Sequence, residues 1–180
     1  GNAYFKFEPL REMLDDCKPG MQDRGGMIQR WKGALVGHSY VIGVDTAWGK
    51  TGSFSCGIML DRRTGEQVAE VHGRPDLDEL AQVVYDLHRE YQRAYIMPEW
   101  AGDEDEGQYV VRKLVELGAG PWMYYRDPEA RKQPGFVTNS TTRPYILALE
   151  EAAVRTKSIV PHCKDWVMEI LKACRQQNVS

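Results

Sequence analysis

A clear strand pattern begins in residues 40–60, YVIGVDTAWGKTGSFSCGIML. It opens with an apolar, partly β-branched run at 40–44, which is typical of a buried strand. Asp45 ends this run, and a glycine-rich segment separates it from a second apolar run at 54–60. A third run at 67–71 follows a short polar turn, so the stretch and its continuation predict three consecutive antiparallel strands.

Beyond these runs, helical and strand patterns alternate. Asp76, with Glu79 three residues later, predicts a capping box for a helix that ends near Arg93. The remaining patterns predict strands at 94–97, 122–125 and 158–160, and helices at 8–17, 108–117, 142–155 and 165–174. Strands that alternate with helices require right-handed crossovers and parallel pairing. The sequence therefore predicts an α/β fold with a mixed five-stranded sheet, three antiparallel strands and then parallel ones, and helices on both faces.

Length and composition indicate one globular domain with an appendage. The chain has 180 residues, of which 42% are hydrophobic and 27% charged. Residues 1–39 are rich in glycine and carry proline and scattered aromatic side chains, so we expect an arm or linker there and the domain proper at 40–180. The four cysteines are widely spaced, which favours a reducing compartment and argues against a standard zinc module. No apolar run has the length of a membrane helix.

The segment Gly49-Lys50-Thr51 raises the possibility of a phosphate-binding P-loop. The pattern G-x-x-x-x-G-K-[ST] needs its first glycine at position 44, which is Val44 here. A strand-like run follows the segment, so no helix N-terminus is available to hold phosphate. We therefore interpret the glycines as a hairpin turn, with Lys50 as a candidate contact to a DNA phosphate.

Asp45 offers the other candidate site. Glu99 ends the predicted strand at 94–97, and that strand is expected to pair beside the first one, so the two carboxylates should lie side by side. Oxygen ligands of this kind suit Mg²⁺ or Mn²⁺, and two such ions can hydrolyse a phosphodiester. The alternative is that Asp45 caps the turn and Glu99 is solvated. The net charge of −3 argues against a generally basic nucleic-acid binder but leaves DNA open as a substrate.

Several motifs occur together in a recognisable order. GVDTA at 43–47 precedes a glycine-rich turn, LDRRTGEQVAE spans 60–70, an apolar strand ends in Glu99, and GFVTNSTTRPYILALEEAAV spans 135–154. This arrangement resembles the nuclease domain of the large terminase subunit of tailed bacteriophages. The resemblance covers about residues 33–174 and implies a ribonuclease-H-like fold.

The resemblance also implies an activity and a setting. The family consists of metal-dependent endonucleases, with Mg²⁺ or Mn²⁺ at a two-metal site, that cut concatemeric double-stranded DNA during genome packaging. Asp45 and Glu99 match its first and second metal-binding acids. The implied partners are double-stranded DNA, a terminase ATPase domain, the small terminase subunit and the portal protein, with no membrane. The implied location is the cytoplasm of the infected bacterial host.

The family's third acid lies beyond the helix that matches 165–174, and no acid follows that helix before Ser180. We expect this acid beyond Ser180, or a substitute within the chain. The candidate substitutes are Asp165, Glu169, Asp103 and Asp105.

Basic and hydroxyl side chains suggest where DNA would lie. Thr141 and Arg143 stand at the start of the predicted helix at 142–155, where a helix N-terminus suits a backbone phosphate. Arg131 and Lys132 lie in the loop before it. The alternatives are simple N-capping of the helix and a solvated charged loop.

The sequence is also compatible with three other functions. A Holliday-junction resolvase or a ribonuclease H would use the same fold. A catalytically incomplete module would serve as a structural part of a packaging motor. A nucleotide-binding protein would use Lys50.

Overall fold

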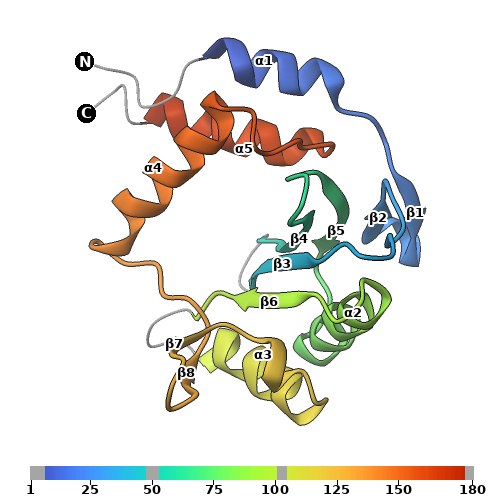
Figure 1. Cartoon of the computed structure of the whole chain (residues 1–180), viewed down its shortest axis with the longest axis vertical. Coiled ribbons are helices and arrows are strands. Elements are labelled where there is room, and N and C mark those ends of the chain that lie inside the picture. Colours follow the sequence, from blue (N-terminus) through green and yellow to red (C-terminus); the bar gives the residue numbers. More distant parts are fainter. Residues whose placement is uncertain (1–6, 48–52, 101–104, 177–180) are drawn as a thin grey trace.

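The computed structural model describes residues 7–47, 53–100 and 105–176. A six-stranded sheet lies between two groups of helices (Figure 1). Its strands are β1 (Met21–Asp23), β2 (Ile28–Arg30), β3 (Tyr40–Asp45), β4 (Ser55–Asp61), β5 (Gln67–Gly73) and β6 (Tyr95–Pro98). The helices are α1 (Phe7–Asp16), α2 (Leu77–Glu90), α3 (Asp105–Glu116), α4 (Thr142–Arg155) and α5 (Lys164–Gln176). A separate hairpin consists of β7 (Tyr125–Asp127) and β8 (Lys132–Pro134).

The sheet is mixed, as the sequence predicts. Its strand order is β1-β2-β5-β4-β3-β6, with β4 antiparallel to both of its neighbours, β3 and β5. Strand β6 pairs parallel to β3, with α2 as part of the crossover. The predicted α/β class, the three antiparallel strands and the parallel fourth strand are therefore confirmed.

The predicted count of five strands is wrong in two places. The segment 122–125 does not become a full sheet strand, because only Met123 forms an isolated parallel bridge, to Ile96, before the chain enters the β7–β8 hairpin. Strands β1 and β2 come instead from the predicted arm, and Ile28 pairs with Val71 of β5. This pairing covers an edge of β5 that would otherwise be open. Proteins commonly protect exposed strand edges by such pairing or covering.

Helix α2 shows how local sequence sets an element. The Asp76 side chain accepts a hydrogen bond from the Glu79 backbone N–H at 2.7 Å, so the predicted N-cap is confirmed. The helix ends at Glu90, three residues before the predicted end. Gln92 and Arg93 then adopt positive φ values of 57° and 61°, which turns the chain into β6.

Two separate hydrophobic cores support the two groups of helices. One core joins the sheet to α2 and α3, and its members include Ile42, Met59, Leu80, Val84 and Leu114. The other joins α1, α4 and α5, and its members include Leu10, Val154, Val167 and Ile170. Helices thus lie on both faces of the sheet (Figure 1). No helix in the described part of the chain is long and apolar enough to cross a membrane.

Candidate metal centre

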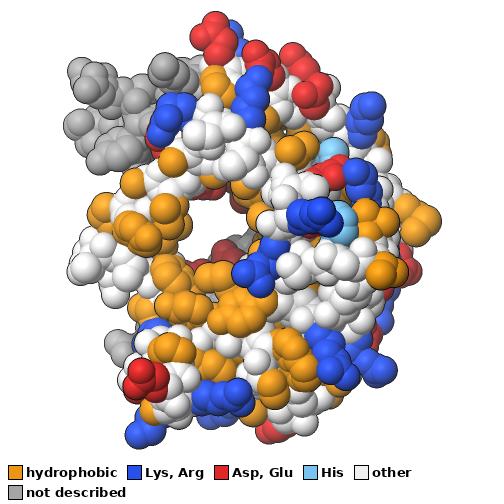
Figure 2. Space-filling view, viewed as in Figure 1, with side chains coloured by type: hydrophobic (Ala, Val, Ile, Leu, Met, Phe, Trp, Pro, Cys, Tyr) orange, Lys and Arg blue, Asp and Glu red, His pale blue; other side chains and the backbone are white. Residues whose placement is uncertain are grey.

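A cavity of about 730 Å³ lies between the sheet and helices α4 and α5. Figure 2 shows an opening there that is bordered by hydrophobic side chains. The sheet contributes carboxylates and apolar groups from the ends of β3 and β6, and the two helices contribute further carboxylates and aromatic rings. The residues that matter for the chemistry of this cavity are Asp45, Glu99, Tyr124, Phe136, Thr138, Tyr145, Glu150, Trp166 and Glu169.

The alternation of strand β3 places Asp45 in the cavity. Ile42 and Val44 are buried on the side of the α2 core, so Gly43 and Asp45 face the opposite side, where the cavity lies. Asp45 is the last residue of the strand, which leaves its side chain accessible from the cavity.

Parallel register brings Glu99 beside Asp45. Val44 is the partner of Pro98 across the β3–β6 pair, so Asp45 and Glu99 follow at equivalent positions. The Glu99 backbone N–H donates to the Val44 carbonyl oxygen at 2.7 Å, and Glu99 also forms a parallel bridge with Phe136. The two side-chain carboxyl groups come within hydrogen-bonding reach of each other. The predicted side-by-side placement of these acids is present in the structure.

Burial and mutual repulsion make it unfavourable for Asp45 and Glu99 to be charged together. The pKa of Asp45 is raised to about 6, first by desolvation, then by its hydrogen bond to Glu99, the negative charge of Glu99 and that of Glu169. Solvent reaches Asp45, but the cavity walls replace much of the water that would stabilise its charge. A divalent cation between the carboxylates would relieve this repulsion.

Two more carboxylates enter the cavity from the helices. Glu169 of α5 was among the candidate third acids, and the structure places it on the cavity wall. Glu150 of α4 was not predicted. Its pKa is raised by burial and by the charge of Glu169. No local pattern distinguishes Glu150 from its neighbour Glu151, which lies on the surface and pairs with Arg155 at 3.1 Å.

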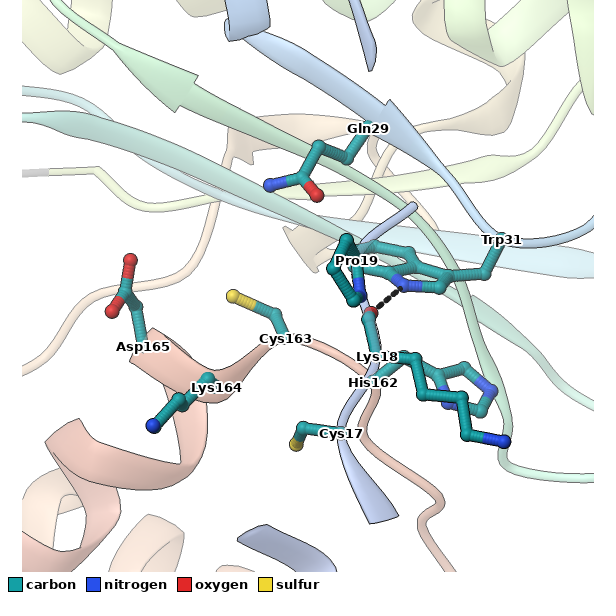
Figure 3. Close-up of a pocket in the computed structure, with 9 residues that line it drawn as sticks. All are labelled: Cys17, Lys18, Pro19, Gln29, Trp31, His162, Cys163, Lys164 and Asp165. Carbon is teal, nitrogen blue, oxygen red and sulfur yellow. Dashed lines mark hydrogen bonds between the residues drawn. The ribbon is translucent and has the colours of Figure 1, made fainter. Parts of the chain in front are cut away.

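Of the other candidate third acids, Asp165 lies elsewhere. Asp165 lines a separate pocket of about 230 Å³ together with Cys17 and Cys163 (Figure 3). Asp103 lies outside the described residues, and Asp105 is the first residue of α3.

The donor set suits a hard cation. Carboxylate oxygens are the ligands that Mg²⁺ and Mn²⁺ prefer, and the cavity has room for ions with their waters. Among the described residues, however, no three His, Cys, Asp or Glu side chains converge closely enough to hold one ion. The pair of Asp45 and Glu99 therefore fits a metal, with Glu169 of α5 as a further acid in the same cavity rather than a member of the same close cluster.

The candidate DNA contacts lie beside this cavity or outside the described residues. Lys50 belongs to the segment 48–52, which is not described. Thr141 and Arg143 are exposed at the start of α4. Arg131 and Lys132 are exposed in the β7–β8 hairpin. None of these four side chains lines the cavity, although the hairpin and α4 flank the Phe136–Thr138 segment that does.

The N-cap of α4 differs from the expected one. Thr141 occupies the cap position, but its side chain makes no capping hydrogen bond. The Asn139 Oδ1 atom accepts instead from the backbone N–H groups of Thr141 and Thr142, both at 2.9 Å. The Thr141 hydroxyl is therefore not used by the cap.

Several solved structures share the fold of this chain. No protein-family model and no curated protein match the sequence. The large terminase nuclease from thermophilic phage G20c, solved with bound magnesium, superposes with a TM-score of 0.65 at 17% identity, over 89% of this chain and 78% of that one. The same nuclease with bound cobalt gives 0.64 at 17% identity, over 89% and 78%. The large terminase nuclease domain of Thermus phage P74-26 gives 0.58 at 19% identity, over 89% and 76%. The chain therefore has the same α/β fold as these large terminase nucleases.

Proposed function

We propose that this chain is the nuclease domain of a viral terminase large subunit, a metal-dependent endonuclease that cuts concatemeric double-stranded DNA during genome packaging. The observation that carries the proposal is the pair of Asp45 and Glu99 at adjacent parallel strand ends, within a cavity of a fold shared with such nucleases. Both acids are assigned as metal ligands and, through the metal, as catalytic residues.

The chain's own residues have three tasks in this reaction. Asp45 and Glu99 would hold Mg²⁺ or Mn²⁺, and a divalent ion bound there supplies Lewis-acid activation of water and neutralises charge on the phosphodiester. Glu169 would complete the acidic wall toward a second ion. The cavity walls limit the water around the acids, which strengthens their interaction with a cation.

The surroundings of the cavity suit a DNA backbone. The residues proposed to contact phosphates are Thr141 and Arg143 at the start of α4, Arg131 and Lys132 in the hairpin, and Lys50, which lies outside the described residues. Affinity that comes from such contacts carries little sequence preference.

The setting proposed for the chain follows from the same function. Residues 1–39 would lead into the domain at 40–180 from a terminase ATPase domain, and the small terminase subunit and the portal protein would be further partners. The enzyme would act in the cytoplasm of the infected bacterial host.

A second candidate function is a catalytically incomplete module of the packaging motor. It is favoured by the lack of a close three-acid cluster among the described residues. Nicking of supercoiled plasmid in the presence of Mn²⁺ separates the two. Cleavage that is lost in Asp45→Ala supports the nuclease. No cleavage by the wild-type chain supports the incomplete module, and cleavage that survives Asp45→Ala refutes the metal site. A preference for four-way junctions or RNA–DNA hybrids over plain duplex would indicate a resolvase or a ribonuclease H instead.

A further inference from the structure

The helices that carry Glu150 and Glu169 are not joined to the sheet by a shared hydrophobic core. Val167 and Ile170 of α5 pack with Leu10 of α1 and Val154 of α4, and among the described residues this cluster has no member in common with the core of the sheet. Figure 1 shows α4 and α5 standing over the sheet on the side away from α2 and α3. The position of Glu169 above the Asp45–Glu99 pair must therefore depend on other contacts.

Val160 forms backbone hydrogen bonds with Gly65 and Gln67, and further polar contacts lie directly before α5. The Gln67 Oε1 atom of β5 accepts hydrogen bonds from the backbone N–H groups of His162 and Cys163, both at 2.8 Å. The Cys163 thiol donates to Glu70 Oε1 at 3.2 Å. Helix α5 begins at Lys164, the next residue, so these bonds fix its first turn to the sheet.

A β-bulge turns Gln67 toward this contact. Ala69 and Val71 face the core of the sheet, and strict alternation would point Gln67 the same way. The register shifts by one residue, since Met59 pairs with Ala69 while Leu60 pairs with Gln67. Val68 is the extra residue, and the shift lets Gln67 share a face with Glu70, as bulges commonly re-aim a side chain.

Each of these two buried residues also carries a polar atom that the contacts with the start of α5 do not use. Gln67 is fully buried and Glu70 is 3% exposed, and among the described residues Gln67 Nε2 and Glu70 Oε2 have no hydrogen-bond partner. Burial raises the pKa of Glu70. An apolar side chain at position 70 would avoid the unpaired Glu70 oxygen, whereas one at position 67 would leave the backbone N–H groups of His162 and Cys163 without their acceptor.

A second set of contacts holds the same segment from the arm. His162 Nε2 lies 2.8 Å from Glu66 Oε1, and the other Glu66 oxygen accepts from Lys32 Nζ at 2.6 Å. The Trp31 ring stacks on His162, with ring centroids 6.0 Å apart, while its N–H donates to the Lys18 carbonyl oxygen at 2.6 Å (Figure 3). The residues before α5 are thus held between β5 and the arm.

We propose that Gln67 and Glu70 are positioning residues that fix the start of α5 and thereby hold Glu169 beside the Asp45–Glu99 pair. Glu169 lies six residues after Cys163, about 9 Å along a rigid helix. A small tilt at the start of α5 therefore moves Glu169 relative to the pair. This inference rests on the proposed nuclease function, in which Glu169 supports metal binding.

The test compares Gln67→Met, which removes the acceptor but keeps the length of the side chain, with Gln82→Met on the exposed face of α2 as the matched control. Alkylation of Cys163, mapped by mass spectrometry against Cys56 of β4 as an internal reference, should be faster in Gln67→Met on the order of tenfold. The Mn²⁺ concentration for half-maximal nicking should rise roughly tenfold, with much of the maximal rate recovered at saturating metal. Gln82→Met should match the wild type in both.

A second pair of variants guards against misfolding. Glu70→Gln keeps an acceptor for the Cys163 thiol and should retain the wild-type metal dependence, whereas Glu70→Met should behave like Gln67→Met. Unchanged Cys163 alkylation and unchanged metal dependence in both methionine variants would overturn the inference. Mn²⁺ binding by calorimetry keeps the two proposals apart. A wild-type chain that binds Mn²⁺ without cutting DNA refutes the nuclease alone, and weaker Mn²⁺ binding by Gln67→Met then still supports the positioning role.

Discussion

Asp45 and Glu99 meet because the residues before them, Val44 and Pro98, are register partners of two adjacent parallel strands. The main-chain hydrogen bond from Glu99 N–H to Val44 O, at 2.7 Å, fixes this relationship independently of either carboxylate. Neutral amide variants of the two acids should therefore leave the backbone in place and remove only the charge. That property makes them sharp probes of the metal centre.

The first prediction concerns the two acids. Asp45→Asn and Glu99→Gln should each lower Mn²⁺-dependent DNA nicking on the order of 1,000-fold, because several kcal/mol of transition-state stabilisation depend on the bound metal. Asp86→Asn, an exposed acid paired with Arg24 at 3.0 Å, is the control and should cut at the wild-type rate. An active Glu99→Gln variant would show that the Glu99 carboxylate is not needed as a metal ligand.

The second prediction concerns pH and stability without metal. The pKa of Asp45 is about 6 in the folded chain against 3.8 for an ordinary aspartate, so the folded state binds this proton more tightly. The stabilisation is complete below about pH 4 and is lost as the pH rises through about 6. Thermal unfolding should thus show that Asp45→Asn gains melting temperature over the wild type at about pH 8 but not at about pH 4. An equal difference at both pH values would contradict this assignment.

The third prediction concerns pH and metal. Protons and Mn²⁺ compete for Asp45, so Mn²⁺ binding by the wild-type chain should weaken steeply as the pH falls through about 6. Calorimetric titrations across this range measure the effect. In Glu169→Gln the transition should move to lower pH, because Glu169 contributes to the raised pKa of Asp45. A transition that does not move would show that Glu169 lies too far away to matter.

The fourth prediction concerns the turn between β4 and β5. Gly65 has φ of +74°, and a Cβ atom built there would lie 1.8 Å from the Ser158 carbonyl oxygen. Gly65→Ala should lower the free energy of unfolding by about 3 kcal/mol, since it combines backbone strain with a collision. Gly25→Ala is the matched control, with φ of +67° and nothing within 4 Å, and should cost only about 1 kcal/mol. Urea unfolding measures both, and equal losses would contradict the close packing of Ser158 on Gly65.

The fifth prediction concerns DNA binding. Arg143→Ala at the start of α4 should reduce the slope of log affinity against log salt concentration by about 1, with little change in sequence preference. Fluorescence anisotropy with duplex DNA at several salt concentrations gives the slope. Arg155→Ala at the other end of α4, where the side chain pairs with Glu151, serves as the control. An unchanged slope in Arg143→Ala would place the DNA elsewhere.

The part of the fold that the sequence predicts correctly is the part with strong local signals. The long apolar runs that became β3, β4 and β5 and the capping box of α2 identify their own structure, and the chain order then sets which strands are parallel. The placement of Asp45 beside Glu99 follows from that order alone. It requires no knowledge of side-chain packing.

The features that were missed depend on contacts between distant segments. Strands β1 and β2 have three residues each and form only because β5 offers an open edge, so their glycine-rich surroundings gave no local signal. Glu169 stayed one of several candidates because the tilt of α5 over the sheet is set by Gln67 and Glu70, about 100 residues earlier in the chain. A contact between segments this far apart in the chain produces no local pattern in the sequence.

The most direct test of the metal centre is anomalous diffraction from crystals of the wild-type chain soaked in Mn²⁺. We expect a Mn²⁺ peak between the carboxylates of Asp45 and Glu99, on the cavity side of β3, that disappears in Asp45→Asn crystals. A cavity without a peak, or a peak that contacts neither Asp45 nor Glu99, would contradict it.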